Sequence, residues 1–300
     1  MRVDPNYITN LVSALDQSQL SEQQSSAELS SGVRVNSLSD DPLASGEDVL
    51  LLNQMQQDDS FTQTSSLVTG QLQVADSALG GVVSQLTQAI SLATRGNNGT
   101  LNASDLQSIS NQIAGIRDEV MSLANTSYQG QYIFAGGLTF TTPFTTSTAT
   151  SPATTVYNGD EDVNSVQTPG GQSIQLNVPG NQIFTASGAN SVFGALNNLV
   201  DDFASGSSSN TATADTEALG TALNYVSQQR IVIDNSLTRL SDASSAVSSE
   251  KTQLTAAQTN LMQADVAQVS SQLSLSKTQE TALEDVISQL GSGSLFDKLQ

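Results

Sequence analysis

The feature that most constrains this chain is a seven-residue apolar repeat in its C-terminal third. No proline follows Pro179, so this stretch has no residue that must break a helix. Residues seven apart lie on one side of a helix, and a strict repeat of seven makes that helix wrap around a partner. The repeat consists of Leu219, Val226, Ile233, Leu240, Val247, Leu254 and Leu261. It predicts a long helix, from about residue 219 to 290, that pairs lengthwise with another helix.

The partner is expected nearer the N-terminus, where two stripes alternate apolar spacings of three and four. The first is Leu72, Ala75, Leu79, Val82, Leu86, Ala89 and Ala93, and the second is Leu106, Ile109, Ile113, Ile116, Val120 and Leu123. Residues 95–99, Arg-Gly-Asn-Asn-Gly, read as a turn between them. Any one stripe alone fits an ordinary amphipathic bundle, but three stripes of matching period favour an elongated bundle.

The middle of the chain is predicted to be a small β module. Four of the six prolines and a Thr-rich run fall between residues 139 and 180, and Gly pairs lie at 136–137 and 170–171, which argues against helix. Segments 154–157 and 173–178 read as short strands. Eight of the thirteen aromatic side chains lie between Tyr128 and Phe193, where a small module needs bulky core residues.

The fold class expected is therefore mainly α with a small β insert: an elongated antiparallel helical bundle or coiled coil formed by the N- and C-terminal arms, with a central β-rich domain. The seam shifts phase after Leu261, which indicates either a joint between helices or local overwinding. The predicted segments are a helical N-terminal assembly segment 1–42 that pairs with the C-terminus, bundle parts 43–137 and 193–263, a β-rich outer domain 138–192, and a C-terminal assembly helix 264–300.

Two sets of residues are predicted to carry the contacts. The helical stripes that pack within one chain include Leu79, Leu86, Ile109, Ile113, Ile116, Val120, Leu223, Ile233, Leu240 and Val247. The terminal segments offer apolar residues for contacts between copies, as a hypothetical assembly interface: Ile8, Leu11, Leu15, Val266, Val269, Leu273, Leu283, Ile287, Leu290, Leu295, Phe296 and Leu299.

Composition excludes most catalytic and nucleic-acid-binding functions. The chain has no Cys and no His, so it offers no thiolate nucleophile, imidazole base or ordinary zinc site. A formal net charge of −20 leaves no basic face for phosphate backbones. No segment is apolar enough to cross a membrane. We expect no enzyme activity, no cofactor, no metal, and no nucleic-acid or membrane partner.

Weaker motifs have plainer explanations. Residues 158–164 alternate Asn and Asp like a calcium loop, but Val163 and Pro169 stand where an EF-hand needs Gly and Glu. The pairs at 40–41 and 201–202 are expected to be caps or turns rather than an acid-base couple. Three Asn-x-Ser/Thr triplets, at Asn98, Asn102 and Asn125, are expected by chance in a chain this rich in Ser and Asn.

Two terminal motifs carry a family resemblance. Residues 29–36, Leu-Ser-Ser-Gly-Val-Arg-Val-Asn, followed by Ser-Asp-Asp-Pro at 39–42, resemble the signature near the start of bacterial flagellins and hook-associated proteins, and the end at 294–299 is similar to their C-terminal tail. Within that family, Leu-Ala-Asn-Thr at 123–126, Gly-Gln-Tyr-Ile-Phe-Ala-Gly at 130–136, Tyr-Asn-Gly-Asp at 157–160 and Asn-Val-Pro-Gly at 177–180 resemble the hook-filament junction proteins.

The resemblance implies a structural, non-enzymatic role. A junction protein of this family joins hook to filament by ring-like self-assembly through its paired terminal helices. Its partners would be copies of itself, a neighbouring hook-associated protein, flagellin and a cytoplasmic export chaperone. It would be extracellular, exported without a cleavable signal peptide, in keeping with the polar start at residues 1–6. A flagellin that forms the filament itself, and a secreted coiled-coil surface protein or adhesin, remain the alternatives.

Overall fold

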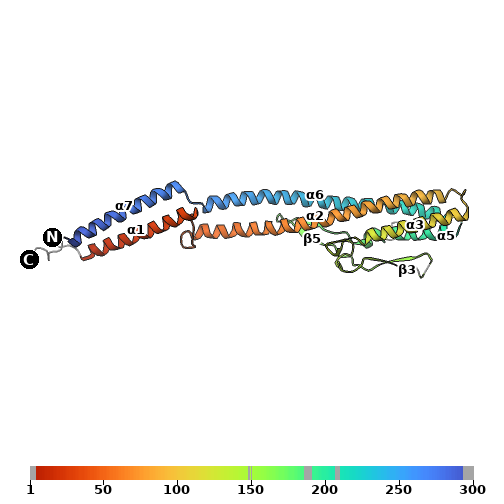
Figure 1. Cartoon of the computed structure of the whole chain (residues 1–300), viewed down its shortest axis with the longest axis horizontal. Helices are drawn as coiled ribbons and strands as arrows, with labels where there is room; N and C mark the ends of the chain where they lie inside the picture. Colours follow the sequence, from red (N-terminus) through yellow and green to blue (C-terminus); the bar gives the residue numbers. More distant parts are fainter. Residues whose placement is uncertain (1–4, 148, 150, 186–190, 207–209, 293–300) are drawn as a thin grey trace, which may run out of the picture. The chain divides into compact units, whose positions relative to one another are not determined.

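The structure, a computed structural model, describes residues 5–147, 149, 151–185, 191–206 and 210–292. Within them the chain forms helices α1 (Pro5–Ser31), α2 (Pro42–Gly96), α3 (Ala103–Ala124), α4 (Gly180–Phe184), α5 (Val192–Ala204), α6 (Asn210–Met262) and α7 (Val266–Ser292) (Figure 1). The strands are β1 (Ser127–Tyr128), β2 (Gln131–Tyr132), β3 (Phe144–Ser147), β4 (Thr154–Tyr157), β5 (Ser165–Gln167) and β6 (Ser173–Gln175). The predicted fold class, mainly helical with a small β insert, is confirmed.

Helix ends follow local chemistry. Helix α2 begins with Pro42, whose fixed φ and missing N–H suit the first helical position. Helix α3 is capped by Asn102, whose side chain accepts a hydrogen bond from the Asp105 backbone N–H. The turn expected at 95–99 separates α2 from α3. The single helix predicted from 219 to 290 is wrong, because residues 263–265 break it into α6 and α7; the phase shift after Leu261 marks a joint.

Contacts within the chain divide it into two compact units. Unit 1 comprises residues 1–57 and 249–300, and unit 2 comprises residues 58–248. Both boundaries fall inside helices, α2 and α6. The reason is that short hydrogen-bonded connectors hold the ends of α2 and α6 to α1 and α7.

Unit 2 holds the main hydrophobic core, to which α2, α3, α5 and α6 all contribute. Within this unit α2 and α6 run antiparallel. Asn97 near the end of α2 donates to Thr216 Oγ1 at 3.0 Å, and Asp76 earlier in α2 accepts two hydrogen bonds from Arg230, at 2.8 and 3.1 Å. This bidentate ion pair fixes the two helices side by side.

The β insert of unit 2 consists of three antiparallel hairpins, β1–β2, β3–β4 and β5–β6. The strand expected at 154–157 is confirmed, and the one expected at 173–178 is shorter, ending at Gln175. The first hairpin precedes the predicted start of the β-rich domain at residue 138. It forms because Gln129 and Gly130 both take positive φ, +51° and +80°, as a two-residue hairpin turn requires.

An aromatic cluster anchors the insert to the helices. The rings of Phe134, Phe144, Phe184 and Phe193 are fully or almost fully buried, and their centroids lie 5.3 to 5.8 Å apart. Edge-on and tilted contacts of this kind suit the charge distribution of aromatic rings. The cluster joins α4 and α5 to the loop after β2 and to β3.

Unit 1 contains α1 and α7 together with one end each of α2 and α6. Helix α1 packs antiparallel along α7 (Figure 1). Residue Ser18 of α1 contacts Ser276 of α7, and Gln19 contacts Glu280. The two terminal helices therefore pair with each other, and the residues at the centre of the pairing are polar.

Candidate assembly surface

A polar seam holds α1 against α7. Ser18, Ser25 and Ser276 are each less than a tenth exposed. The Ser18 hydroxyl donates to the Ser276 carbonyl oxygen at 3.0 Å, and the hydroxyls of Ser276 and Ser21 are 3.1 Å apart. Serine is small enough for the helices to approach closely, but it buries little apolar surface. The seam is thus specific in geometry and weak in hydrophobic stabilisation.

Charged side chains flank this seam. Gln19 donates to Glu280 at 3.1 Å, and Lys277 lies 3.7 Å from Glu22. A hydrogen bond with Glu280, together with desolvation and repulsion from that carboxylate, raises the pKa of Glu22 above its usual value, and Lys277 opposes the shift. Two carboxyl groups therefore share one site, and the arrangement is most favourable when one of them is protonated.

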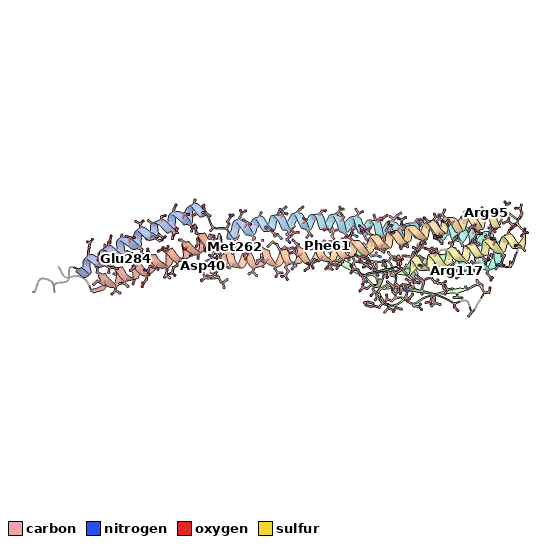
Figure 2. All side chains as sticks on the ribbon, in the orientation of Figure 1. Asp40, Phe61, Arg95, Arg117, Met262 and Glu284 are labelled. Carbon is pink, nitrogen blue, oxygen red and sulfur yellow. The ribbon has the colours of Figure 1, made fainter. Side chains whose placement is uncertain are left out.

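The connector between α1 and α2 is a folded element built from the signature at 29–42. Gly32 takes a positive φ of +71°, which ends α1. The Arg34 backbone N–H donates to the Met262 carbonyl at 2.7 Å, and the Ala264 N–H donates to the Gly32 carbonyl at 3.0 Å. This short ladder joins the connector to the α6–α7 joint. Figure 2 labels Asp40 and Met262 in these two segments.

Side chains of the same signature complete the connector. Arg34 pairs with Asp41 at 3.0 Å and also donates to the Leu261 carbonyl at 3.2 Å. Asp41 caps α2 by accepting from the Ala44 N–H at 3.0 Å. Hydrogen bonds to Ala44 and Arg34 lower the pKa of Asp41, and those from Ser37 and Asn36 lower the pKa of Asp40. The signature residues thus have structural roles. The prediction that Asp40 and Asp41 form caps or turns is confirmed.

Large apolar side chains point away from these contacts. In unit 1 the exposed fraction of Leu43 is 74%, and that of Leu50 is 70%. Contiguous exposed apolar patches are rare in monomeric soluble proteins, so this set of residues is a candidate contact surface. The exposed set in unit 1 comprises Tyr7, Ile8, Val12, Leu20, Leu29, Leu38, Leu43, Val49, Leu50, Leu52, Val266, Leu275 and Val286.

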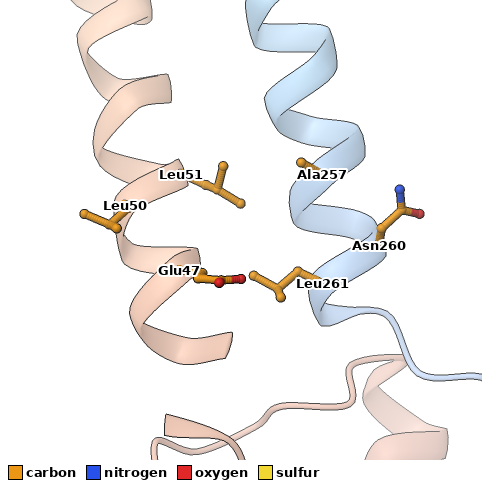
Figure 3. A pocket seen from close by; sticks show the side chains of 6 residues that line it. All are labelled: Glu47, Leu50, Leu51, Ala257, Asn260 and Leu261. Carbon is orange, nitrogen blue, oxygen red and sulfur yellow. The ribbon is translucent and has the colours of Figure 1, made fainter. Parts of the chain in front are cut away.

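Part of this surface is a groove between α2 and α6. Its volume is about 590 Å³, and it is lined by Glu47, Leu50, Leu51, Ala257, Asn260 and Leu261. Figure 3 shows Leu51 and Glu47 extending from α2 towards α6, with Leu261 extending back from α6. Four of the six lining residues are apolar, and Glu47 places a carboxylate at the edge. The groove is suited to an apolar segment that carries one positive charge.

The residues predicted for the assembly interface do not share one environment. Ile8 and Val266 are more than half exposed, and Val269 is buried within the chain itself. Leu11, Leu15, Leu273, Leu283 and Ile287 are half-buried, as part of the α1 and α7 helices. Leu295, Phe296, Leu299 and the side chain of Leu290 lie outside the described residues. The sequence did not identify Leu20, Leu43 and Leu50 as exposed. Their spacing is compatible with an ordinary helix, and they belong to no motif.

The residues predicted for the intramolecular bundle lie in the unit 2 core. Leu79, Leu86, Ile113, Val120 and Leu240 are completely buried. Ile109, Ile116, Ile233 and Val247 are also buried, and Leu223 is half-buried at the edge of the same core. Leu223 lies between two repeat positions, and its neighbours Leu219 and Val226 take the central places.

The other candidate motifs have structural partners. Asp160 accepts hydrogen bonds from the backbone N–H groups of Gly137 and Asp162, and Asn177 bonds both Asn164 and the Asp162 carbonyl, so the calcium-like alternation organises a loop. Among the described residues no group of acidic side chains is arranged to hold a metal ion. Asn102 caps α3, and Asn125 makes two hydrogen bonds to the Phe144 backbone.

None of α1 to α7, over the residues that the structure describes, combines the length and the apolar character that crossing a bilayer needs.

Comparison with known proteins connects these features to the bacterial flagellum. Residues 6–139 match the family of the bacterial flagellin N-terminal helical region. Flagellar hook-associated protein 3 of Salmonella typhimurium is 31% identical over 182 residues, which are 60% of this chain and 56% of that protein. Flagellin of Bacillus subtilis is 26% identical over 280 residues, 89% of this chain and 88% of that protein.

A solved structure of a flagellar hook-associated protein from Vibrio parahaemolyticus has the same fold, with a TM-score of 0.67 and 22% identity. It covers 75% of this chain, and the whole of the solved chain is matched. This chain spans little more than half the length of the Salmonella protein. Residues 6–139 thus resemble the flagellin N-terminal helical region, and the Vibrio structure shares the fold of this chain.

Proposed function

We propose that this chain is a structural component of the bacterial flagellum that joins hook to filament by self-assembly through its paired terminal helices. The similarity to hook-associated protein 3 carries this proposal. The geometry of unit 1 supports it, since its two terminal helices pair through a polar seam while large apolar side chains face outward. A surface of this kind is satisfied when copies pack side by side.

The expected partners follow from that role. Copies of the same chain contact one another through unit 1, a hook-associated protein adjoins the layer on the hook side, and flagellin adjoins it on the filament side. An export chaperone covers the apolar surface before assembly. The protein works outside the cell as part of the flagellum. Its function is mechanical rather than enzymatic, as expected for relatives that are flagellar components.

A filament-forming flagellin is the second candidate, because the Bacillus subtilis flagellin matches over most of this chain. Its identity is lower, at 26% against 31%, although its match is longer. The segment at 123–136, which resembles junction proteins, favours the first candidate. The two roles predict different phenotypes, so a genetic experiment separates them.

The test is to delete the gene in its native bacterium and to image flagella by electron microscopy while assaying flagellin in the medium. We expect bare hooks, full-length flagellin monomers in the medium and loss of swimming. Bare hooks without any flagellin in the medium would instead identify this chain as the filament protein. Full-length filaments on the hooks would contradict both flagellar roles.

A chain lacking residues 290–300 makes the test sharper. Expressed in the deletion strain, it should fail to restore filaments even where it is exported, because the terminal segments carry the contacts between copies. The full-length chain serves as the control. Restoration of filaments by the truncated chain would show that the C-terminal segment is dispensable.

A further inference from the structure

The groove between α2 and α6 in unit 1 has no occupant among the described residues. Among the residues that line it, Leu50 is 70% exposed. A leucine in this state keeps most of its apolar surface in water, so its burial against a partner would be favourable. The groove therefore exposes apolar surface that a partner could bury, and it carries one acidic side chain, Glu47 (Figure 3).

One segment of the chain has the complementary chemistry. Residues 294–299, Ser-Leu-Phe-Asp-Lys-Leu, place Leu295, Phe296 and Leu299 at spacings that share one face of a helical turn. Lys298 is one of only nine basic residues in a chain of net charge −20. It can pair with the carboxylate of Glu47, while Phe296 supplies the bulky aromatic anchor that contact sites favour.

This segment cannot reach the groove of its own chain. Helix α7 has 27 residues, so it extends about 40 Å from its start near the groove. Leu299 lies seven residues beyond Ser292, where α7 ends, and seven residues span at most about 25 Å when fully extended. The tail therefore falls short of the groove while α7 stays helical. A C-terminal tail that fills the groove must therefore come from another copy.

We propose that the groove lined by Leu50, Leu51 and Leu261 binds residues 294–299 of a second copy of this chain, with Lys298 of that copy paired to Glu47. The inference rests on the proposed self-assembly and adds to it a specific contact. Each copy then offers one groove and one tail, so the contact is head-to-tail and extends from copy to copy. A contact of this type builds a ring or a helical layer rather than an isolated pair.

Cysteine cross-linking tests this contact directly, because the natural chain contains no cysteine. Full-length chains that carry Leu50→Cys alone are mixed with chains that carry Phe296→Cys alone, under mild oxidation and at a concentration where assembly occurs. We expect a disulfide-linked pair that contains one chain of each kind. A disulfide forms only where the two Cβ atoms come within about 4.5 Å, so the link reports a close contact.

The matched control is Leu67→Cys, on the same helix and 56% exposed, but outside the groove. It should cross-link to Phe296→Cys about tenfold less, a difference equivalent to about 1.4 kcal/mol. Equal cross-linking from positions 50 and 67 would overturn the proposal. So would an intrachain disulfide in the doubly substituted chain at high dilution, because that tail would have reached its own groove.

The ion pair gives a second readout. Glu47→Lys should lower the cross-linking yield between positions 50 and 296 about threefold, as expected for a partly exposed ion pair worth less than 1 kcal/mol. Introducing Lys298→Glu into the tail-bearing chain should restore it. If Glu47→Lys left the cross-linking yield unchanged, Lys298 would not be part of the contact. The deletion phenotype is independent of these assays, so bare hooks without cross-linking would reject the groove contact and leave the junction role standing.

Discussion

The core of unit 2 and the α1–α7 seam of unit 1 are both made of paired helices, yet they are built from different residues. Around Ile113, Leu79 and Leu219 the core of unit 2 is completely buried and apolar. At the centre of the α1–α7 seam stand Ser18 and Ser276, and several larger apolar side chains, such as Ile8, Leu20 and Leu275, face solvent. Unit 2 buries its apolar surface within the chain, whereas α1 and α7 leave much of theirs exposed.

This contrast separates folding from assembly. Burial of leucine and isoleucine supplies most of the free energy of folding in a domain, so unit 2 is equipped to fold alone. A serine seam contributes about 1 kcal/mol per hydrogen bond at best. In the proposed self-assembly, neighbouring copies would cover Ile8, Leu20 and Leu275, which α1 and α7 leave exposed.

The largest effect is expected at the unit 2 core. Ile113→Asp places a charge in a completely buried apolar site and should lower the free energy of unfolding by on the order of 4 kcal/mol. Ile8→Asp, at a position 53% exposed in α1, should leave the thermal midpoint almost unchanged and impair assembly instead. Equal loss of thermal stability in the two variants would abolish the distinction between the two regions.

A smaller effect is expected where α2 meets α5. A Cβ atom at Gly96 would lie 2.6 Å from ring atoms of Phe203, which is completely buried. Gly96→Ala should therefore cost about 1–3 kcal/mol through overpacking. Gly115→Ala in α3 is the control, because no atom lies within 4 Å and helix propensity alone should add about 0.5–1 kcal/mol. Chemical denaturation measures both; stabilisation at Gly96 would contradict the packing.

The connector of unit 1 should respond more weakly. Arg34→Ala removes an ion pair with Asp41 that is partly exposed, so it should cost less than about 1 kcal/mol. Asp41→Ala should cost about 1 kcal/mol more, since it also removes the cap of α2 at Ala44. Hydrogen exchange at the start of α2 measures this local stability. A greater loss for Arg34→Ala than for Asp41→Ala would refute the capping role.

The smallest effect concerns pH and the α1–α7 seam. The pKa of Glu22 is raised in the folded chain, so the protonated form favours the folded state. The stabilisation that protonated Glu22 contributes is fully present below the pKa that Glu22 has in the unfolded chain. It is lost as pH rises through the pKa that Glu22 has in the folded chain. Protection of α1 amides, corrected for intrinsic exchange, should fall over that range, and Glu22→Gln should flatten the dependence. Protection that rises with pH in the natural chain would reverse the sign.

The acidic connector supplies an internal contrast for the same experiment. The pKa values of Asp40 and Asp41 are lowered, so their contribution is present above the unfolded pKa and is lost as pH falls through the folded pKa. Amides in the connector and in the seam should therefore respond to acid in opposite directions. The same trend in both would show that global unfolding dominates.

Much of this architecture could be predicted from the sequence, because apolar periodicity reports directly on burial. The repeat from Leu219 to Val247 is buried as its spacing implies, and the stripe around Ile113 lies in the same core. The break after Leu261 was visible as a phase shift. Its nature as a joint depended on hydrogen bonds to Gly32 and Arg34, which lie more than 200 residues away in the sequence.

The α1–α7 seam could not be predicted in the same way. Serine gives no periodic signal, since it is found at caps, on surfaces and in close helix contacts alike. Ser276 and Glu280 interrupted the C-terminal stripe, and both occupy the seam. The exposed Leu43 and Leu50 could not be identified either, because exposure depends on which faces of α2 its neighbours leave open.

The most direct test of the central distinction is hydrogen exchange measured by mass spectrometry on the monomer and on assembled protein. In the monomer we expect α3 amides to exchange near the global unfolding limit, with α1 and α7 exchanging far faster. On assembly, protection should rise strongly in α1 and α7 and little in α3. Equal protection of α1 and α3 in the monomer would show that the polar seam is self-sufficient and would contradict the account.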